Sequence, residues 1–250
     1  MARYQVILAY DGTRFQGYQR QPNISGSLTI QGVFEEALKR LGWQDGTTLA
    51  AGRTDAGVHA SGQVVAFDFE WKHAQEALQA ALNAHLPKDV VVQSIQPAAP
   101  DFHPRYDALT RKYRYRIYCR PVPDPLRERY AWRVWPAVEP ETLQQAASIL
   151  VGRHDFAAFG TPPRTGGSTV RTVLLAGWHP EDIDLVFEIV GDAFLYRMVR
   201  RLVYLQVAVG QGRLEPKQLA AFLQSPPPSP VQGLAPPQGL VLVEVTFEKT

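Results

Sequence analysis

Apolar and polar positions in the first hundred residues change between a two-residue period and a longer one, which is typical of strands that alternate with helices. Four short runs predict strands, at residues 4–10, 47–52, 62–69 and 89–98. Apolar residues three and four positions apart predict a helix over 28–42, which ends at Gly42, and a second over 73–87, which ends at Pro87. The predicted order is strand, helix, strand, strand, helix, strand.

The rest of the chain approximately repeats this pattern. Strands are predicted at 108–120, 131–136, 169–180, 182–191 and 239–248, with the third and fourth forming a hairpin. Helices are predicted over 140–152, 194–210 and 215–225. Helices grouped on one face of a mostly antiparallel sheet give an α+β fold. We therefore predict two ferredoxin-like halves, each similar to an RNA-recognition sheet, divided near Pro104 into residues 1–104 and 105–250.

Composition places the chain among ordinary globular proteins, with 45% hydrophobic and 20% charged residues. No apolar run approaches the roughly 18 residues that a membrane-spanning helix needs, and the amino-terminal segment predicts a strand rather than a signal peptide. Cys119 is the single cysteine, which excludes an intramolecular disulfide and a thiolate metal cluster. We therefore expect a cytoplasmic protein with no membrane partner.

The sequence lacks the motifs of several chemistries. It has no P-loop, no G-x-S-x-G nucleophile elbow and no H-E-x-x-H zinc motif, and its six histidines do not fall at ligand spacing. We therefore expect no metal and no cofactor, so that an enzyme built from this chain would work with side chains alone.

A glycine-rich turn between two predicted strands carries one carboxylate, Asp55, close to Arg53. Glycines in such a turn allow a ligand to approach the main chain closely, and the turn can project the acid into a cleft. Alternatively, Asp55 only caps the turn through a side-chain hydrogen bond. Both interpretations remain open from the turn alone.

The predicted strand "TRKYRYRIYCR" (110–120) interleaves cations with tyrosines. Arg111, Tyr113 and Tyr115 share one face, and Lys112, Arg114 and Arg116 share the other. The pattern fits an RNA platform, where arginines meet phosphates and rings stack on bases, or an amphipathic strand with a solvated basic face. The net charge of only +2 does not decide between these two interpretations. Of the 26 cations 20 are arginine, the residue better suited to phosphate contacts and to stacking on bases.

Arg200 lies on a predicted helix, on a stripe with Tyr196, Val203 and Val207. An arginine on such an apolar face is expected to be partly buried, and a buried guanidinium needs an anion. Four carboxylates are candidate partners, namely Asp55, Asp68, Glu188 and Asp192.

The stretch "AGRTDAGVHASGQ" (51–63) closely resembles the active-site signature of the tRNA pseudouridine synthase A family. "YDGTRFQGYQRQPN", "FHPRYDALTRKYRYRIY", "FLYRMVR" and "APPQGLVLVEV" resemble the opening, central and late motifs of that family in the same order, so the resemblance covers essentially the whole chain. The sequence departs from the family pattern at Tyr18, where Trp is usual, at Asp192 and Ala193, where Asn and Gly are common, and at Tyr204, where Gly is usual.

The resemblance implies an isomerase that converts uridine to pseudouridine at positions 38 to 40 of the tRNA anticodon stem-loop. It implies that Asp55 is the catalytic nucleophile, that Arg200 is paired with it, and that Tyr113 stacks on the target base, which leaves Arg53 for a phosphate. It also implies a homodimer, a catalytic cleft between the halves and no cofactor.

The sequence argues against two other classes of function. An RNA-binding module without catalytic activity has no use for a carboxylate among phosphates, which Asp55 would repel. A uridine methyltransferase with Asp55 as general base would require a cofactor loop, which the sequence does not contain.

Overall fold

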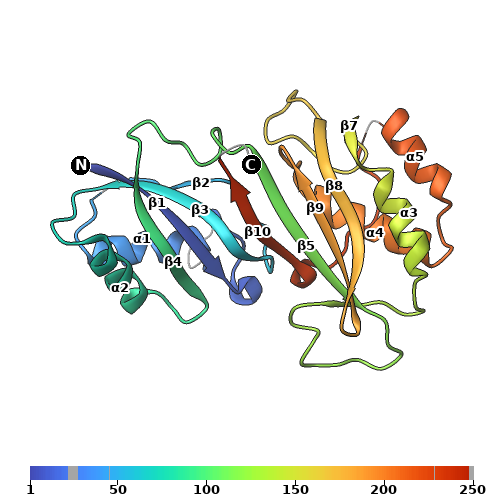
Figure 1. Cartoon of the computed structure of the whole chain (residues 1–250), viewed down its shortest axis with the longest axis horizontal. Helices are drawn as coiled ribbons and strands as arrows, with labels where there is room; N and C mark the ends of the chain where they lie inside the picture. Colours follow the sequence, from blue (N-terminus) through green and yellow to red (C-terminus); the bar gives the residue numbers. More distant parts are fainter. Residues whose placement is uncertain (22–27, 45, 228, 248–250) are drawn as a thin grey trace. The chain divides into compact units, whose positions relative to one another are not determined.

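The computed structural model describes residues 1–21, 28–44, 46–227 and 229–247. The chain divides into two compact units, Met1–Leu109 together with Val241–Thr250, and Thr110–Leu240. The predicted halves, 1–104 and 105–250, differ from these units because the final strand pairs with a strand of the first unit. Helices and strands alternate in both units, which gives a mixed α/β protein (Figure 1).

The first unit is built on an antiparallel sheet. Its strands are β1 (Ala2–Tyr10), β2 (Leu49–Ala50), β3 (His59–Phe69), β4 (Val90–Ala98) and β10 (Leu240–Thr246). They lie in the order β4-β1-β3-β10, with β2 also paired to β3. The pairs β1·β3, β1·β4 and β2·β3 are antiparallel, whereas β10 runs parallel to β3. The helices are α1 (Ile30–Arg40) and α2 (Gln75–His85).

The core of the first unit lies between its sheet and α1. Tyr4, Val6 and Leu8 alternate along β1 as buried side chains, as the period of the sequence predicts. Phe34 of α1 packs edge-on against Phe67 of β3 at 5.8 Å between ring centroids, and Phe67 stacks on Tyr4 at the same distance. These contacts fix α1 on one face of the sheet.

The second unit contains an antiparallel sheet in the order β5-β9-β8-β7, and the short strand β6 pairs in parallel with β5. The strands are β5 (Thr110–Tyr118), β6 (Trp132–Arg133), β7 (Gly152–Asp155), β8 (Val170–Glu181) and β9 (Asp184–Gly191). The helices are α3 (Pro140–Ser148), α4 (Met198–Gly210) and α5 (Pro216–Gln224). No helix formed by the described residues is long and apolar enough to cross a membrane.

One face of the second sheet is covered by α3 and α4 (Figure 1). Tyr115 of β5, Phe187 of β9 and Trp178 of β8 lie side by side on this face. The indole of Trp178 donates to the side chain of Gln206 in α4 at 2.8 Å, and its main-chain N–H donates to Gln144 of α3 at 2.7 Å. These hydrogen bonds satisfy buried polar groups and attach both helices to the sheet.

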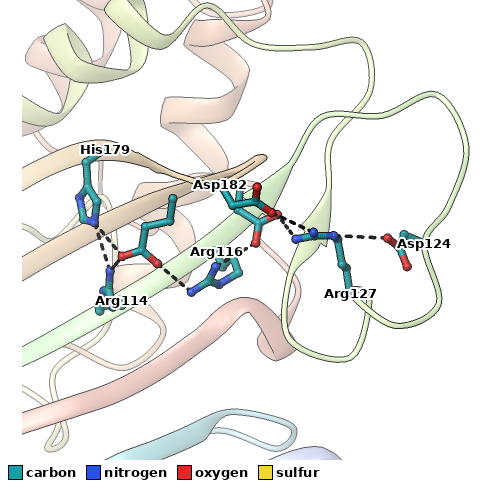
Figure 2. A network of polar contacts seen from close by, with 8 residues as sticks. Arg114, Arg116, Asp124, Arg127, His179 and Asp182 are labelled. Atoms are coloured by element: carbon teal, nitrogen blue, oxygen red, sulfur yellow. Dashed lines mark hydrogen bonds and ion pairs between the residues drawn. The ribbon is translucent and has the colours of Figure 1, made fainter.

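The other face of this sheet holds Lys112, Arg114 and Arg116 of β5, and carboxylates pair with all three; Figure 2 shows Arg114 and Arg116. Lys112 pairs with Glu188 at 3.0 Å, and Arg114 pairs with Glu181. Arg116 pairs with Asp184 and Glu181, both at 2.9 Å. Arg127, in the segment after β5, pairs with Asp184, Asp182 and Asp124 at 3.0, 3.2 and 3.3 Å. The strand is therefore amphipathic, and the cations on its half-exposed face are paired with carboxylates.

Two predicted helices have different limits in the structure. The helix predicted over 140–152 ends at Ser148, and the residues after Val151 form β7 instead. The helix predicted over 194–210 begins at Met198, because Arg197 adopts a left-handed backbone with φ of 63°. Tyr196 consequently lies outside the helix, and its prediction on the stripe of Arg200 is wrong.

Asp184 is the most buried acid of the charged face, with its side chain 3% exposed, and it pairs with both Arg116 and Arg127. Asp184→Asn is expected to lower the free energy of unfolding by about 2–4 kcal/mol, because two half-buried guanidinium groups lose their carboxylate. The exposed Asp182→Asn variant, which also loses a contact with Arg127, is expected to lose less than about 1 kcal/mol. Equal losses in urea unfolding would contradict this assignment.

Candidate active site

Asp55 lies in a loop of residues 51–58 that joins β2 to β3. Thr54 is buried, Asp55 is half-buried and Arg53 is exposed. The N–H of Val58 donates to the carbonyl of Asp55 at 3.1 Å, so a main-chain bond closes the turn. Arg53 forms no ion pair with any residue that the structure describes, which leaves its guanidinium available for an anion.

Main-chain packing against the segment 12–18 fixes this loop. The N–H of Tyr18 donates to the carbonyl of Thr54 at 3.1 Å, and Gly57 donates to Phe15 at 3.3 Å. Gly17 has a φ of +94°, and a Cβ there would stand 2.9 Å from the oxygen of Thr54. The two segments approach so closely that a side chain at position 17 does not fit.

Side chains of β1 and β3 also bind the loop. The hydroxyls of Tyr10 and Thr54 are 2.8 Å apart, and Gln63 donates to the carbonyl of Gly52 at 2.8 Å. His59 accepts the N–H of Gly12 at Nδ1, at 3.0 Å, which ties the start of β3 to the end of β1. Tyr10, Gln63 and His59 are all buried, so these bonds are shielded from water.

A buried carboxylate anchors the segment 12–20 to α1. Glu35 is 2% exposed, and its Oε1 accepts from Gln31 at 2.9 Å and from the main chain of Thr48 at 3.0 Å. Its Oε2 lies 3.2 Å from Nε of Arg20, while the main-chain N–H of Arg20 donates to Gln31. Burial raises the pKa of Tyr18 strongly, so that this residue carries a neutral hydroxyl.

The second unit holds the other two predicted site residues. Arg200 lies in the first turn of α4, 9% exposed, and its Nε donates to the carbonyl of Ala235 at 2.8 Å. Tyr113 is 8% exposed on β5, and the ring of Phe194 packs edge-on against it at 5.1 Å. The structure therefore confirms the expected burial of Arg200 and gives Tyr113 a fixed ring orientation.

Tyr115 supports the segment to which Arg200 is bound. Its hydroxyl donates to the carbonyl of Pro236 at 2.7 Å, next to the carbonyl that Arg200 contacts. Burial raises the pKa of Tyr115 far above its ordinary value, although the positive charge of Arg200 acts in the opposite sense. Tyr115 is thus a neutral donor that holds residues 235 and 236 against β5 and α4.

Three of the four carboxylates proposed as partners of Arg200 are engaged elsewhere. Asp68 pairs with Arg3 at 2.6 Å, which lowers the pKa of that carboxyl. Glu188 pairs with Lys112, and Asp192 accepts from two main-chain N–H groups at 3.1 and 2.6 Å. Asp55 lies in the first unit and Arg200 in the second, and their pairing stays a prediction.

Sequence reasoning missed the residues that hold the Asp55 loop, namely Tyr10, Gly17 and Gln63. The glycines of "YDGTRFQGYQR" were the available signal, because two glycines beside aromatic residues indicate close main-chain contacts. Their contact with the loop joins residues far apart in sequence, as in the bond between Tyr10 and Thr54.

Comparison with known proteins shows the family of the chain. A family model described as tRNA pseudouridine synthase matches residues 6–107 and 146–248. A tRNA pseudouridine synthase A of Geobacillus kaustophilus is 39% identical over 250 residues, which cover 98% of this chain and 95% of the relative. Another from Limosilactobacillus fermentum is 37% identical over 253 residues, covering 99% of this chain and 97% of the relative.

The chain therefore belongs to the tRNA pseudouridine synthase family, and it is an isomerase. Among solved structures, a chain from an archaeal box H/ACA ribonucleoprotein complex is similar at a TM-score of 0.37 and 14% identity. That match covers 82% of this chain and 44% of the other.

Gly17→Ala is expected to be much more damaging than Gly42→Ala, although both glycines have a φ of +94°. Both variants strain the backbone by about 1 kcal/mol or more, but a Cβ at position 42 meets nothing within 4 Å. Gly17→Ala should lose about 1–3 kcal/mol more in the free energy of unfolding, because its Cβ displaces the Asp55 loop. Equal losses in chemical denaturation would show that the close packing has no energetic weight.

Proposed function

We propose that this protein converts uridine to pseudouridine at positions 38 to 40 of the tRNA anticodon stem-loop, with Asp55 as the nucleophile and no cofactor. The observation that carries the proposal is the loop 51–58, where one carboxylate stands two residues from an exposed arginine that forms no ion pair with the described residues. Membership of the tRNA pseudouridine synthase family, and relatives named tRNA pseudouridine synthase A, support tRNA as the substrate.

The reaction explains why one carboxylate suffices. It breaks the bond between N1 and C1′ of the nucleoside, turns the ring, and joins C5 to C1′, while C5 loses its proton. Nothing is oxidised and no group is added, so the chemistry requires no redox partner and no donor molecule. Three routes start from a carboxylate: attack on the base, attack on the sugar, or removal of the proton at C2′.

Arg200 is the proposed ion partner of Asp55. A carboxylate in a site that retains detached uracil is partly removed from water, and a nearby guanidinium favours its ionised form. The engagement of Asp68, Glu188 and Asp192 with other groups supports Asp55 as that partner. The bond from Nε of Arg200 to Ala235 restricts the side chain in advance, which lowers the entropy lost on pairing.

Tyr113 and Arg53 are the proposed contacts to RNA. The target uridine must leave its stack before a side chain can reach it. The ring of Tyr113, held edge-on by Phe194, offers a platform for the flipped base. Arg53 is exposed without a partner among the described residues, so it is placed in this proposal on a phosphate beside the target.

The remaining features of the proposal concern fold and assembly. Both units are proposed to be variants of the ferredoxin-like arrangement, and the antiparallel order β4-β1-β3-β2 of the first unit supports this. We further propose a homodimer that acts in the cytoplasm, as the family resemblance implies.

The assay that tests this function is incubation with an unmodified tRNA transcript, followed by carbodiimide treatment and mapping of reverse-transcription stops. New stops at positions 38 to 40 are expected. Stops elsewhere would refute the proposed position, and no stops would refute the proposed activity.

In the same assay, Asp55→Asn should form no pseudouridine, because a neutral amide neither attacks carbon nor removes a proton. Filter binding should show tRNA affinity at least equal to that of the wild type, because a negative charge near phosphates has been removed. A variant that still modifies tRNA at the wild-type rate would reduce Asp55 to a residue that caps the turn.

Arg200→Met should lower turnover about 100-fold or more, with a much smaller change in tRNA binding, because the charge that favours ionised Asp55 is lost. Arg201→Met is the matched control, because Arg201 donates to the carbonyls of Phe159 and Val231, both at 2.8 Å. The control should lower the unfolding temperature and leave turnover at saturating tRNA close to that of the wild type. Similar turnover in both variants would contradict the pairing.

A further inference from the structure

Tyr196 and Arg197 form an exposed pair immediately before α4. The ring of Tyr196 belongs to a side chain that is 53% exposed, and the guanidinium of Arg197 lies over it, 4.8 Å from the centroid. Arg197 is itself exposed. Three tyrosines of the described chain are exposed, Tyr106, Tyr130 and Tyr196, and each has an adjacent arginine over its ring. The pair at 196 and 197 has the shortest distance of the three.

The pair is held in place by the main chain rather than by side-chain packing. The N–H of Tyr196 donates to the carbonyl of Thr161 at 3.0 Å, which bridges this segment to the loop after β7. Arg197 has a φ of 63°, a conformation that a residue with a side chain rarely adopts. Such strain persists only where the surrounding structure imposes it, and it is frequent at binding sites.

The charge of Arg197 is not neutralised. Arg197 forms no ion pair with any carboxylate in the part of the chain that the structure describes. The sequence from 193 to 214 contains no acid but has Arg200 and Arg201 in the next helical turn. Burial, together with the positive charges of Arg197 and Arg200, lowers the pKa of Arg201, so these cations act on one another directly.

The arginines on the half-exposed face of β5 differ from Arg197, because they are paired with carboxylates. Arg114 and Arg116 are bound to carboxylates and cannot attract an anion strongly. Arg197 is exposed and has no carboxylate partner among the described residues, so its guanidinium can attract a phosphate. An arginine beside an exposed ring matches the pair of groups a nucleotide presents, a phosphate for the guanidinium and a base for the ring.

We propose that Tyr196 and Arg197 bind one nucleotide of the RNA substrate outside the target uridine, with Arg197 on its phosphate and the Tyr196 ring stacked on its base. This proposal rests on the proposed function, because it assumes an RNA substrate. It adds a second point of contact to the site, one that sets the affinity and position of the RNA and takes no part in the reaction.

A second pair in the same unit provides the control. Arg129 lies over the ring of Tyr130 at 5.6 Å, and Tyr130 is 45% exposed. This pair follows Glu128, which binds the hydroxyl of Tyr118 at the end of β5. The main-chain carbonyl of Asp192, four residues before Tyr196, accepts a hydrogen bond from Arg111 at the start of β5. The two ends of this nine-residue strand are about 26 Å apart.

The experiment measures filter binding of an unmodified tRNA transcript over a range of salt concentrations. Tyr196→Ala should weaken binding by about fivefold to a hundredfold, whereas Tyr196→Phe should bind as the wild type does, because the ring is retained. Arg197→Gly should reduce the slope of log affinity against log salt by about one, because one phosphate contact is lost. Tyr130→Ala should change affinity less than about twofold, because no base is placed there in this account.

Folding and turnover separate this role from a structural one. Arg197→Gly should not lower the unfolding temperature, because glycine adopts a positive φ without strain. At saturating tRNA its kcat should match that of the wild type while KM rises, because the RNA is held less tightly but reacts in the same site.

Four results would overturn the proposal. The first is wild-type affinity in Tyr196→Ala together with a wild-type salt slope in Arg197→Gly, and the second is a loss of affinity in Tyr130→Ala equal to that in Tyr196→Ala. The third is a lowered unfolding temperature in Arg197→Gly, and the fourth is a lower kcat with unchanged KM in the same variant. Wild-type protein that binds tRNA but forms no pseudouridine would instead refute the proposed function, and the binding data would still decide the role of this pair.

Discussion

Close main-chain contact between two turns is the constraint on which the site in the first unit depends. Gly17 and Gly12 allow the segment after β1 to touch the loop 51–58, and a Cβ at position 12 would stand 2.0 Å from the oxygen of Val58. Bonds from Tyr18 to Thr54 and from Gly57 to Phe15 then fix the loop at both sides of Asp55. A carboxylate on a rigid main chain keeps its position when a substrate arrives, which is what a nucleophile requires.

The distribution of charge in the second unit follows from strand register. The pairing of β5 with β9 sets Arg114 opposite Glu188, and the hairpin brings Glu181 and Asp184 beside Arg116. The cations that look most available in the sequence are thereby neutralised, whereas Arg53 and Arg197 keep their charge at the surface. Among the described residues, Arg53 and Arg197 are therefore better able to attract an anion than the paired arginines of β5.

Much of the fold, the turn that carries Asp55 and the burial of Arg200 could be predicted from the sequence. The alternation of Tyr4, Val6 and Leu8 determines β1 and its buried face, and the glycines around Asp55 indicate its turn. Tyr196 was misplaced because the helical period of apolar residues continues through it, while the left-handed backbone of Arg197 leaves no sequence signal. The neutralised face was missed because pairing between distant strands decides it, and local patterns do not carry the register.

The central claim is that Asp55 reacts from a fixed position, and Asp55→Glu tests it most directly. This variant keeps the charge but moves the carboxylate outward by one methylene. The measurement is the single-turnover release of tritium from tRNA labelled at C5 of uridine, because C5 loses its hydrogen when it bonds to C1′. The account predicts a rate lower by about a hundredfold or more with tRNA binding retained. Release at the wild-type rate would contradict it, since a carboxylate that works from either position does not depend on the rigid loop.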